Sequence, residues 1–301
     1  MNVFITGAAK AGTTSLYYYL EQHSQIIAPK VKEPHYFSHV NRSETVVFPK
    51  GNGRGDGSTI WIYDMEEYRK LFPNNHKKEQ DKCYMDAAVT NLYSETASQE
   101  IKYFDSEAKI VILLRNPIDR AWSHYNHLVR DGREKETFEK GLKLEEERIK
   151  KGYEFSWHYK NMGLYDKQVE RYLETFPKDQ VLILLFEEFI THTSKAMKQV
   201  NEFLGLSAFE YEEIQSHNAS GISRSPFLAY SVDQIAGYKK IINQIFPPSV
   251  THKAVQLFRK LNVKKSDEKM QQETREYLRD YFRDSIKRTE KLINQDLSHW
   301  I

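Results

Sequence analysis

A loop between two glycines near the start of the chain has the spacing of a phosphate-binding loop. In FITGAAKAGTTSLYYYL, residues 4–20, Gly7 and Gly12 match the glycines of the ATPase pattern G-x-x-x-x-G-K-[ST]. Thr13 takes the position of the ATPase lysine, and the only lysine of the loop, Lys10, lies two residues before Gly12. The loop therefore differs from an ATP site at the residue that would reach the terminal phosphates.

The residues that follow the second glycine support an anion site. A loop that leaves a strand and opens a helix presents backbone N–H groups and the positive helix end to an anion. Thr13, Thr14 and Ser15 add hydroxyl donors. Two glycines alone are equally compatible with an ordinary strand–turn–helix that has N-capping threonines. The choice between these interpretations depends on the rest of the chain.

A second group of candidate residues follows an apolar run from Ile110 to Leu114. A magnesium-dependent nucleotidase is expected to end this strand in an aspartate that holds the metal, whereas VILLRNP ends in Arg115. Ser123 lies eight residues later, one or two turns into the next helix, so both side chains can reach one phosphate. The planar guanidinium suits that role because it binds oxyanions bidentately. The alternative for Arg115 is a cap or an ion pair with Asp119.

Three apolar runs alternate with segments of helical periodicity. NVFITG precedes a helical pattern at residues 13–23, and AKIVILL precedes a turn at residues 116–117 and a polar helix. The third run, residues 180–189, lies between amphipathic segments at 164–176 and 194–206. Continuous apolar strands that alternate with helices predict an α/β fold, with a P-loop-like parallel sheet flanked by helices on both faces.

The overall composition predicts a globular protein. The chain has 301 residues, of which 40% are hydrophobic, and this length suits a single domain over residues 1–301. Lysine and arginine number 44 and aspartate and glutamate 42, so the net charge of +2 argues against a nucleic-acid partner. Residues 49–58 carry five glycines or prolines, which predicts a loop insertion at about residues 40–60.

Several features favour a cytoplasmic location and no membrane partner. Cys83 is the only cysteine, so no intrachain disulfide can form. Met1 stands directly before the first apolar run, which leaves no room for a signal peptide, and no apolar run has the length of a membrane span. The charged segment 132–152 is expected to form a solvated helix without a functional role.

The combined motifs resemble the sulfotransferases that use 3′-phosphoadenosine 5′-phosphosulfate (PAPS), especially their heparan-sulfate-type and bacterial branch. GAAKAGTTSL is similar to the 5′-phosphosulfate loop, and LLRNPIDRAWSHY is similar to the 3′-phosphate motif, with Arg115 and Ser123 in the matching places. KEPHYF, residues 32–37, resembles the segment that carries the catalytic acid. The resemblance implies in-line, metal-independent sulfuryl transfer from PAPS to a hydroxyl or amine of a small-molecule or carbohydrate acceptor.

The resemblance also implies roles for individual residues. Lys10 would neutralise the leaving phosphate oxygen, because an ammonium gains most where charge develops in the transition state. Glu33 would be the general base, in a turn where Pro34 restrains the preceding backbone. His35 would orient Glu33 or the acceptor, although a histidine beside aromatic residues is more often structural. The nucleotide would be bound by Lys10, Ala11, Gly12, Thr13, Thr14, Ser15, Arg115, Ser123, Ser220, Gly221 and Arg224.

Two of these assignments have open alternatives. HNASGISRSPF, residues 217–227, has a flexible polar centre, so Ser220, Gly221 and Arg224 could close over the nucleotide. A plain surface loop would have a similar sequence. Trp122 could pack on adenine, but its spacing from Tyr125 suits a core position equally well.

The chain departs from the family pattern at MDAAVTNLY, residues 85–93. Asp86 and Ala88 replace a basic residue and a proline that many members have there. In the polysaccharide enzymes that lysine helps to hold an anionic acceptor, so its absence favours a neutral or cationic small acceptor, contacted by Glu33, His35 and Asp86. Two other functions stay open: a P-loop kinase with an atypical lysine, which needs magnesium, and a non-catalytic nucleotide-binding protein, which does not need Glu33.

Overall fold

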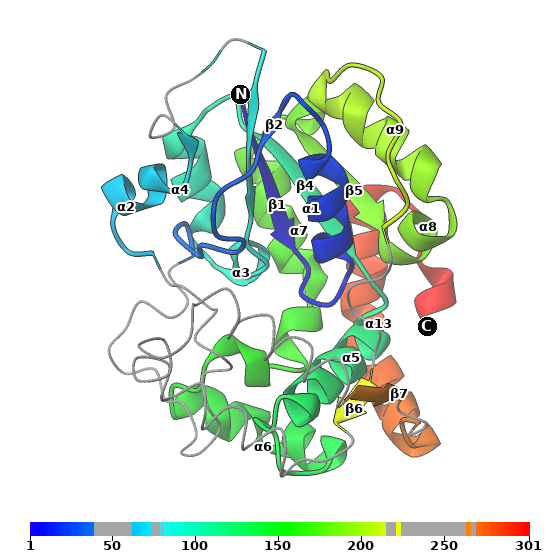
Figure 1. Ribbon diagram of the computed structural model, residues 1–301. Helices are drawn as coiled ribbons and strands as arrows, with labels where there is room; N and C mark the ends of the chain where they lie inside the picture. The colour runs from blue at the N-terminus through cyan, green and yellow to red at the C-terminus, as the bar shows by residue number, and fades with distance from the viewer. Residues whose placement is uncertain (39–61, 74–78, 80, 215–220, 224–262, 266–268) are drawn as a thin grey trace.

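The structure is a computed structural model that describes residues 1–38, 62–73, 79, 81–214, 221–223, 263–265 and 269–301. Its centre is a five-stranded parallel sheet with the strand order β2-β3-β1-β4-β5 (Figure 1). The strands are β1 (Asn2–Gly7), β2 (Ile26–Ile27), β3 (Cys83–Ala87), β4 (Lys109–Leu114) and β5 (Val181–Leu185). The predicted parallel sheet is confirmed, with two further strands, β2 and β3, that the apolar runs did not reveal.

Helices cover both faces of the sheet, as predicted. One face carries α1 (Thr13–Glu21) and α9 (Thr193–Leu204), and the other carries α7 (Tyr165–Thr175), which packs against α4 (Ala97–Phe104) and α13 (Gln272–Ile293) (Figure 1). The remaining helices are α2 (Met65–Lys70), α3 (Thr90–Tyr93), α5 (Pro117–Arg130), α6 (Phe138–Lys150) and α8 (Phe186–Thr191). Short 3-10 turns are η2 (Phe155–Trp157), η3 (Asn161–Gly163), η4 (Lys178–Gln180) and η5 (Ser298–Trp300).

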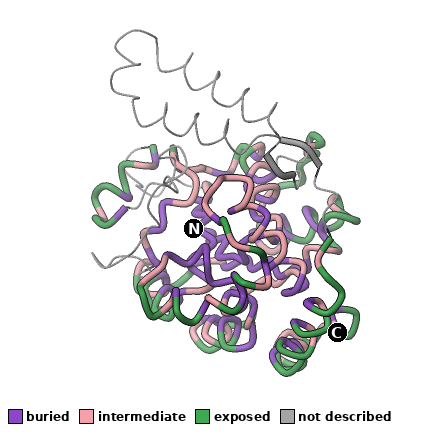
Figure 2. The backbone as a smooth tube through the Cα atoms, turned by 90° about the horizontal axis from the view of Figure 1, so that it is seen from below, coloured by how far each residue is buried: buried purple, intermediate pink, exposed green. Residues whose placement is uncertain are grey.

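The central strands form the middle of the core. Val3 and Ile5 of β1 and every residue from Ile110 to Leu114 of β4 are fully buried. Figure 2 shows this as a buried centre with exposed residues gathered on the outer helices. Because both faces of these strands are buried, their sequences are continuously apolar and do not alternate between apolar and polar residues.

Two expectations about secondary structure are corrected. The third apolar run is not one strand over residues 180–189, because β5 ends at Leu185 and α8 begins at Phe186. The charged segment 132–152 is not a solvated helix: α6 begins only at Phe138, and Glu134 and Arg148 are buried. The two guanidinium nitrogens of Arg148 donate to Glu134 at 2.6 and 3.0 Å, which makes burial of both charges tolerable.

A two-stranded antiparallel ribbon lies beside α5. It consists of β6 (Gly221–Ser223) and β7 (Val263–Lys265) (Figure 1). The predicted loop insertion at about residues 40–60 lies outside the described residues. Among the described helices, none combines the length and the apolar character that a membrane crossing requires.

Candidate functional site

The loop after β1 has the geometry of an anion site. Gly12 caps α1 with a left-handed φ of +86°, and a side chain there would meet the ring of Phe186 at 2.9 Å, so only glycine fits. Within the described part of the chain, the backbone N–H groups of Gly12, Thr13, Thr14 and Ser15 have no hydrogen-bond acceptor. Four unpaired N–H groups at a helix start, with no acidic residue in the first turn, suit a bound phosphate.

The predicted residues of this loop differ in how far they are exposed. Ala11 and Thr13 are buried, whereas Thr14 and Ser15 are half-buried. Lys10 is half-buried and has a left-handed φ of +67°, which is uncommon for a lysine. Backbone strain of this kind tends to be retained at functional sites.

Arg115 joins the second predicted motif to the loop. Its Nη1 donates a hydrogen bond of 3.0 Å to the backbone carbonyl of Lys10, and its guanidinium lies over the ring of Phe186, 4.6 Å from the centroid. Phe186 therefore contacts Arg115 and also fills the space in front of Gly12. The alternative ion pair with Asp119 is not seen in the described residues, because Asp119 accepts from Arg275 at 2.8 Å.

Lys10 lies among charges of both signs. Burial, then Arg130 and Arg115, lower the pKa of its ammonium to about 8, while Asp131 and Glu33 act in the opposite direction. The group is still mostly protonated at neutral pH. A protonated amine crowded by two guanidiniums is stabilised by an incoming anion, as the predicted role of Lys10 requires.

Other predicted nucleotide contacts lie on and beside α5. Ser123 is half-buried in the second turn of this helix. Gly221 lies in β6, which runs alongside α5, so the structure brings this segment next to the Ser123 helix (Figure 1). Ser220 and Arg224 lie outside the described residues.

Glu33 and His35 form one cluster on strained backbone. Their φ angles of +58° and +55° are left-handed on either side of Pro34. The Nε2 of His35 lies 3.9 Å from the Oε2 of Glu33, and its Nδ1 is 2.7 Å from the Oγ1 of Thr90, the first residue of α3. Lys32 forms a short ion pair with the other oxygen of Glu33. Glu33 remains 29% exposed, so a substrate can reach it.

The protonation states of this cluster favour Glu33 over His35 as the proton acceptor. Partial burial would raise the pKa of Glu33, but Lys32, His35 and Lys10 outweigh it and lower that pKa. Burial lowers the pKa of His35 to about 4, so its ring is neutral at neutral pH. Glu33 is therefore a carboxylate and His35 a neutral imidazole, held by Thr90, that can orient it.

Asp86 lies near this cluster but is not directly accessible. It is 2% exposed in β3, and burial raises the pKa of its carboxyl to about 7, an effect that a hydrogen bond from Tyr68 reduces and the charge of Glu33 increases. The interaction with Tyr68 does not meet the criteria of a full hydrogen bond, and neither carboxyl oxygen has another partner among the described residues. Contact with an acceptor would require a movement of the surrounding residues.

Two charged residues at the end of α5 were not predicted. Arg130 lowers the pKa of Lys10 and Asp131 raises it. The pKa of His127 is held well below its usual value mainly by burial, and next by the positive charge of Lys10. Ser123, His127 and Arg130 are spaced i, i+4 and i+7, so they share one face of the helix. That spacing was the available signal in the sequence.

Trp122 packs as a core residue. It is half-buried and stacks on Tyr125 with centroids 5.5 Å apart, and it meets Phe138 edge to face at 5.2 Å. This packing supports the structural alternative for Trp122. In the described residues, no group of three or more histidine, cysteine, aspartate or glutamate side chains is arranged to hold a metal ion.

Comparisons with known proteins place nearly the whole chain in one family. A family model described as "Sulfotransferase domain" matches residues 1–291. The crystal structure of a sulfotransferase from Alicyclobacillus acidocaldarius is 33% identical, with a TM-score of 0.75, and the match covers 99% of this chain and 98% of that one.

Two vertebrate relatives match a smaller region. Bifunctional heparan sulfate N-deacetylase/N-sulfotransferase 1 of Xenopus laevis is 26% identical over 215 residues, which are 70% of this chain and 23% of that protein. Heparan sulfate glucosamine 3-O-sulfotransferase 3B1 of Mus musculus is 27% identical over 202 residues, 67% of this chain and 45% of that protein. The chain thus spans less than half the length of these relatives. The family match over residues 1–291, together with the 33% identity to the bacterial sulfotransferase, shows that the chain belongs to the sulfotransferase domain family.

Proposed function

We propose that the protein transfers a sulfuryl group from PAPS to a hydroxyl or amine of a small-molecule or saccharide acceptor. The observation that carries this proposal is the hydrogen bond of 3.0 Å between Arg115 and the carbonyl of Lys10. It joins the start of α1, whose first N–H groups have no acceptor among the described residues, to a guanidinium that follows β4, the neighbouring strand. Two adjacent anion sites suit a nucleotide with phosphates at both its 3′ and 5′ positions.

The donor set fits such a nucleotide. When bound, PAPS supplies the sulfuryl group and a phosphate oxygen as leaving group. Gly12, Thr13, Thr14 and Ser15 would hold the 5′ end through their N–H and hydroxyl groups, and Arg115 and Ser123 the 3′-phosphate. Lys10 contributes its ammonium beside the same loop, where a positive charge stabilises a developing oxyanion. Ser220, Gly221 and Arg224 stay proposed contacts of the nucleotide.

Glu33 is the group best suited to accept the proton of the acceptor. Its carboxylate is charged, partly exposed and positioned by Lys32 and His35. His35 acts through Glu33 rather than as a base, because a ring with a pKa of about 4 is a weak proton acceptor. Thr90 fixes the orientation of that ring.

The charges near Glu33 favour a neutral or cationic acceptor. Asp86 lies close enough to Glu33 for the charge of Glu33 to raise the pKa of Asp86. A second carboxyl beside the base repels sulfated or carboxylated acceptors and attracts amines. An amino sugar or an amino alcohol would meet these requirements.

The direct test is an acceptor screen with PAPS in the presence of a chelator. The full chain would be incubated with neutral glycans, amino sugars, alcohols and phenols, and products would be scored by mass for the gain of one sulfuryl group. A sulfated product that the Glu33→Gln variant makes far more slowly supports the proposal. Hydrolysis or transfer that needs ATP and magnesium, with no product from PAPS, would contradict it.

A further inference from the structure

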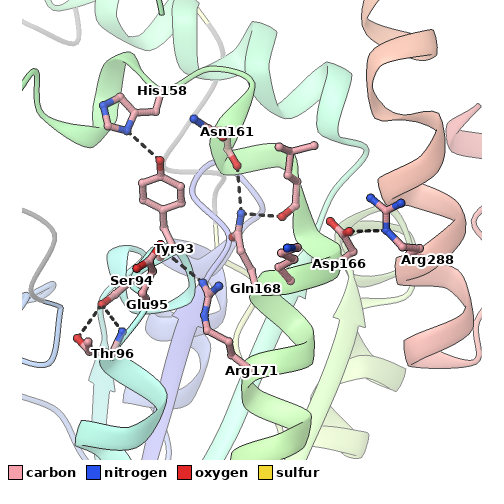
Figure 3. A pocket seen from close by; sticks show the side chains of 12 residues that line it. Tyr93, Ser94, Glu95, Thr96, His158, Asn161, Asp166, Gln168, Arg171 and Arg288 are labelled. Carbon is pink, nitrogen blue, oxygen red and sulfur yellow. Dashed lines mark hydrogen bonds and ion pairs between the residues drawn. The ribbon is translucent and has the colours of Figure 1, made fainter. Parts of the chain in front are cut away.

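A second pocket lies away from the proposed nucleotide site. Its volume is about 620 Å³, within the range of small-molecule sites. It is lined from the end of α3, the loop before α4, the turn at η3, the start of α7 and one residue of α13 (Figure 3). Lys10, Glu33, His35 and Arg115 are not among the residues that line it, so the proposed transfer reaction leaves this pocket unexplained.

The segments that contact His35 also form one wall of this pocket. Thr90 contacts His35 at the start of α3, and Tyr93 lines the pocket at the end of the same one-turn helix, about 5 Å away along its axis. Phe155 lies against the ring of His35, with centroids 6.1 Å apart, and His158 lines the pocket three residues later. The hydroxyl of Tyr93 and the Nδ1 of His158 are 3.0 Å apart and close this wall (Figure 3).

The charges around the pocket have both signs. Asp166 and Arg288 neutralise each other through a contact of 2.6 Å. Arg171 is tied to the wall because its Nη2 donates to the carbonyls of Leu92 and Tyr93 at 3.3 Å each (Figure 3). Lys167 and Glu95, both exposed residues of the lining, add one charge of each sign. A ligand of either charge would meet side chains of its own sign as well as of the opposite sign.

The polar groups of the lining are a mixture of donors and acceptors. Asn161 contributes an amide, Thr96 a hydroxyl and Leu164 an apolar surface. The Nε2 of Gln168 already donates to the carbonyls of Asn161 and Leu164, and the Oγ of Ser94 already accepts from two backbone N–H groups. Within the described residues, the side-chain amide of Asn161 makes no hydrogen bond, so it is available to a ligand. Ligand hydroxyls both donate and accept, so they can bind the amide of Asn161, the hydroxyl of Thr96 and the carboxylate of Glu95.

We propose that this pocket is a second ligand site, which binds a neutral polyhydroxylated molecule of mono- or disaccharide size. The charges of the lining nearly cancel, so neither sign of ligand is strongly selected, and the polar side chains favour hydroxyl groups over an apolar ligand. Because Thr90 and Phe155, which contact His35, lie in the same wall as this pocket, a bound ligand would lie next to the transfer site without occupying it. Binding requires neither PAPS nor turnover, so it can be tested independently of the proposed activity.

The test is a titration of the full chain with maltose and glucose as neutral probes, followed by saturation-transfer NMR and calorimetry. We expect saturable binding in the millimolar range, and weaker binding of glucuronate and glucosamine than of glucose. Saturating adenosine 3′,5′-bisphosphate should not displace maltose. The absence of saturable binding by both neutral sugars, or equal binding of the charged sugars, would overturn the proposal.

Matched variants locate the binding. Asn161→Ala and Glu95→Ala should each weaken maltose binding roughly threefold to tenfold, the effect of one lost hydrogen bond. Glu174→Ala is the control, because Glu174 is an exposed residue of α7 outside the lining. Circular dichroism would establish that each variant is folded. Maltose affinity that stays unchanged in both folded pocket variants, or that falls equally in Glu174→Ala, would place the sugar elsewhere and overturn the assignment.

Discussion

The guanidinium of Arg115 donates a hydrogen bond of 3.0 Å to the backbone carbonyl of Lys10, although the two residues are 105 positions apart in the chain. The bond connects the end of β4 with the loop that follows β1, the neighbouring strand. Because carboxyl ends of adjacent parallel strands lie at one edge of the sheet, two separate motifs become one site there. Arg115 thus supports the loop, and we propose that it also presents its charge to a bound anion.

Arg115→Ala should weaken the binding of adenosine 3′,5′-bisphosphate by about 1.5–3 kcal/mol, the scale of a hydrogen bond to a charged group. Calorimetry on the purified variant measures this change. Arg69→Ala provides the control, since Arg69 is exposed on α2. Affinity that is equal in the wild type and in Arg115→Ala would remove Arg115 from the nucleotide site.

Glu33→Gln should lower turnover by roughly 10²–10⁴ and leave nucleotide affinity nearly unchanged, because the amide keeps the shape but cannot accept the proton. Steady-state rates with the acceptor found by the screen, together with nucleotide calorimetry, separate the two effects. Glu67→Gln on the exposed face of α2 is the matched control. Full turnover by Glu33→Gln would show that another group is the base.

The strand–loop–helix at residues 2–21 and Arg115 were predictable because their signals are local: glycine spacing, an apolar run and a turn at Asn116-Pro117. The structure adds that Asn116 caps α5 through Ile118, at 2.9 Å. The contact between Arg115 and Lys10 was not predictable, since it depends on the order of strands in the sheet. A single sequence does not determine that order.

The charged segment 132–152 shows a second limit. Its glutamates and basic residues have the spacing of a solvated helix, yet Glu134 also accepts from Tyr159 at 2.7 Å, and Glu145 accepts two backbone N–H groups at 2.8 Å. Composition cannot distinguish an exposed charge ladder from a buried network, because the distinction depends on the loop that packs against it. The left-handed backbone of Glu33 could not be predicted either, because a glutamate in a sequence gives no indication of a positive φ, whereas a glycine or an asparagine does.

Nucleotide affinity should decline as the pH rises through about 8, the pKa of Lys10 in the free protein. Below that pH the ammonium is protonated and attracts the phosphates; above it the charge is lost before the ligand binds. Calorimetry at several pH values measures the decline. Lys10→Arg, which stays protonated, should remove most of this alkaline decrease.

An affinity for adenosine 3′,5′-bisphosphate that stays constant across pH 8 in the wild type would exclude Lys10 as a contact. Lys10→Ala should weaken nucleotide binding and slow turnover as well, because the lysine acts in the ground state and more strongly in the transition state. This double effect distinguishes Lys10 from Glu33.

Asp86 should make the folded state less stable as the pH rises from 3.8 to about 7. Its carboxyl has a pKa of about 7 when folded and 3.8 when unfolded, so in this window the folded state binds more protons. Asp86→Asn cannot ionise, and its free energy of unfolding relative to the wild type should increase across the same window. Urea unfolding at several pH values measures it.

Asp179→Asn, at an exposed position before β5, should show no such trend. A loss of stability of Asp86→Asn relative to the wild type as the pH rises would show that the folded protein stabilises the carboxylate of Asp86. That result would contradict a raised pKa for this group.

Thermal unfolding with adenosine 3′,5′-bisphosphate, in the presence of a chelator, tests the central claim most directly. A ligand that binds only the folded state raises the melting temperature by mass action, and the two anion sites require no divalent metal. We expect the bisphosphate to raise the melting temperature in a saturable way and adenosine 5′-phosphate to raise it less. In Arg115→Ala the two nucleotides should raise the melting temperature equally. A larger increase with ATP and magnesium than with the bisphosphate would contradict the assignment and favour a kinase.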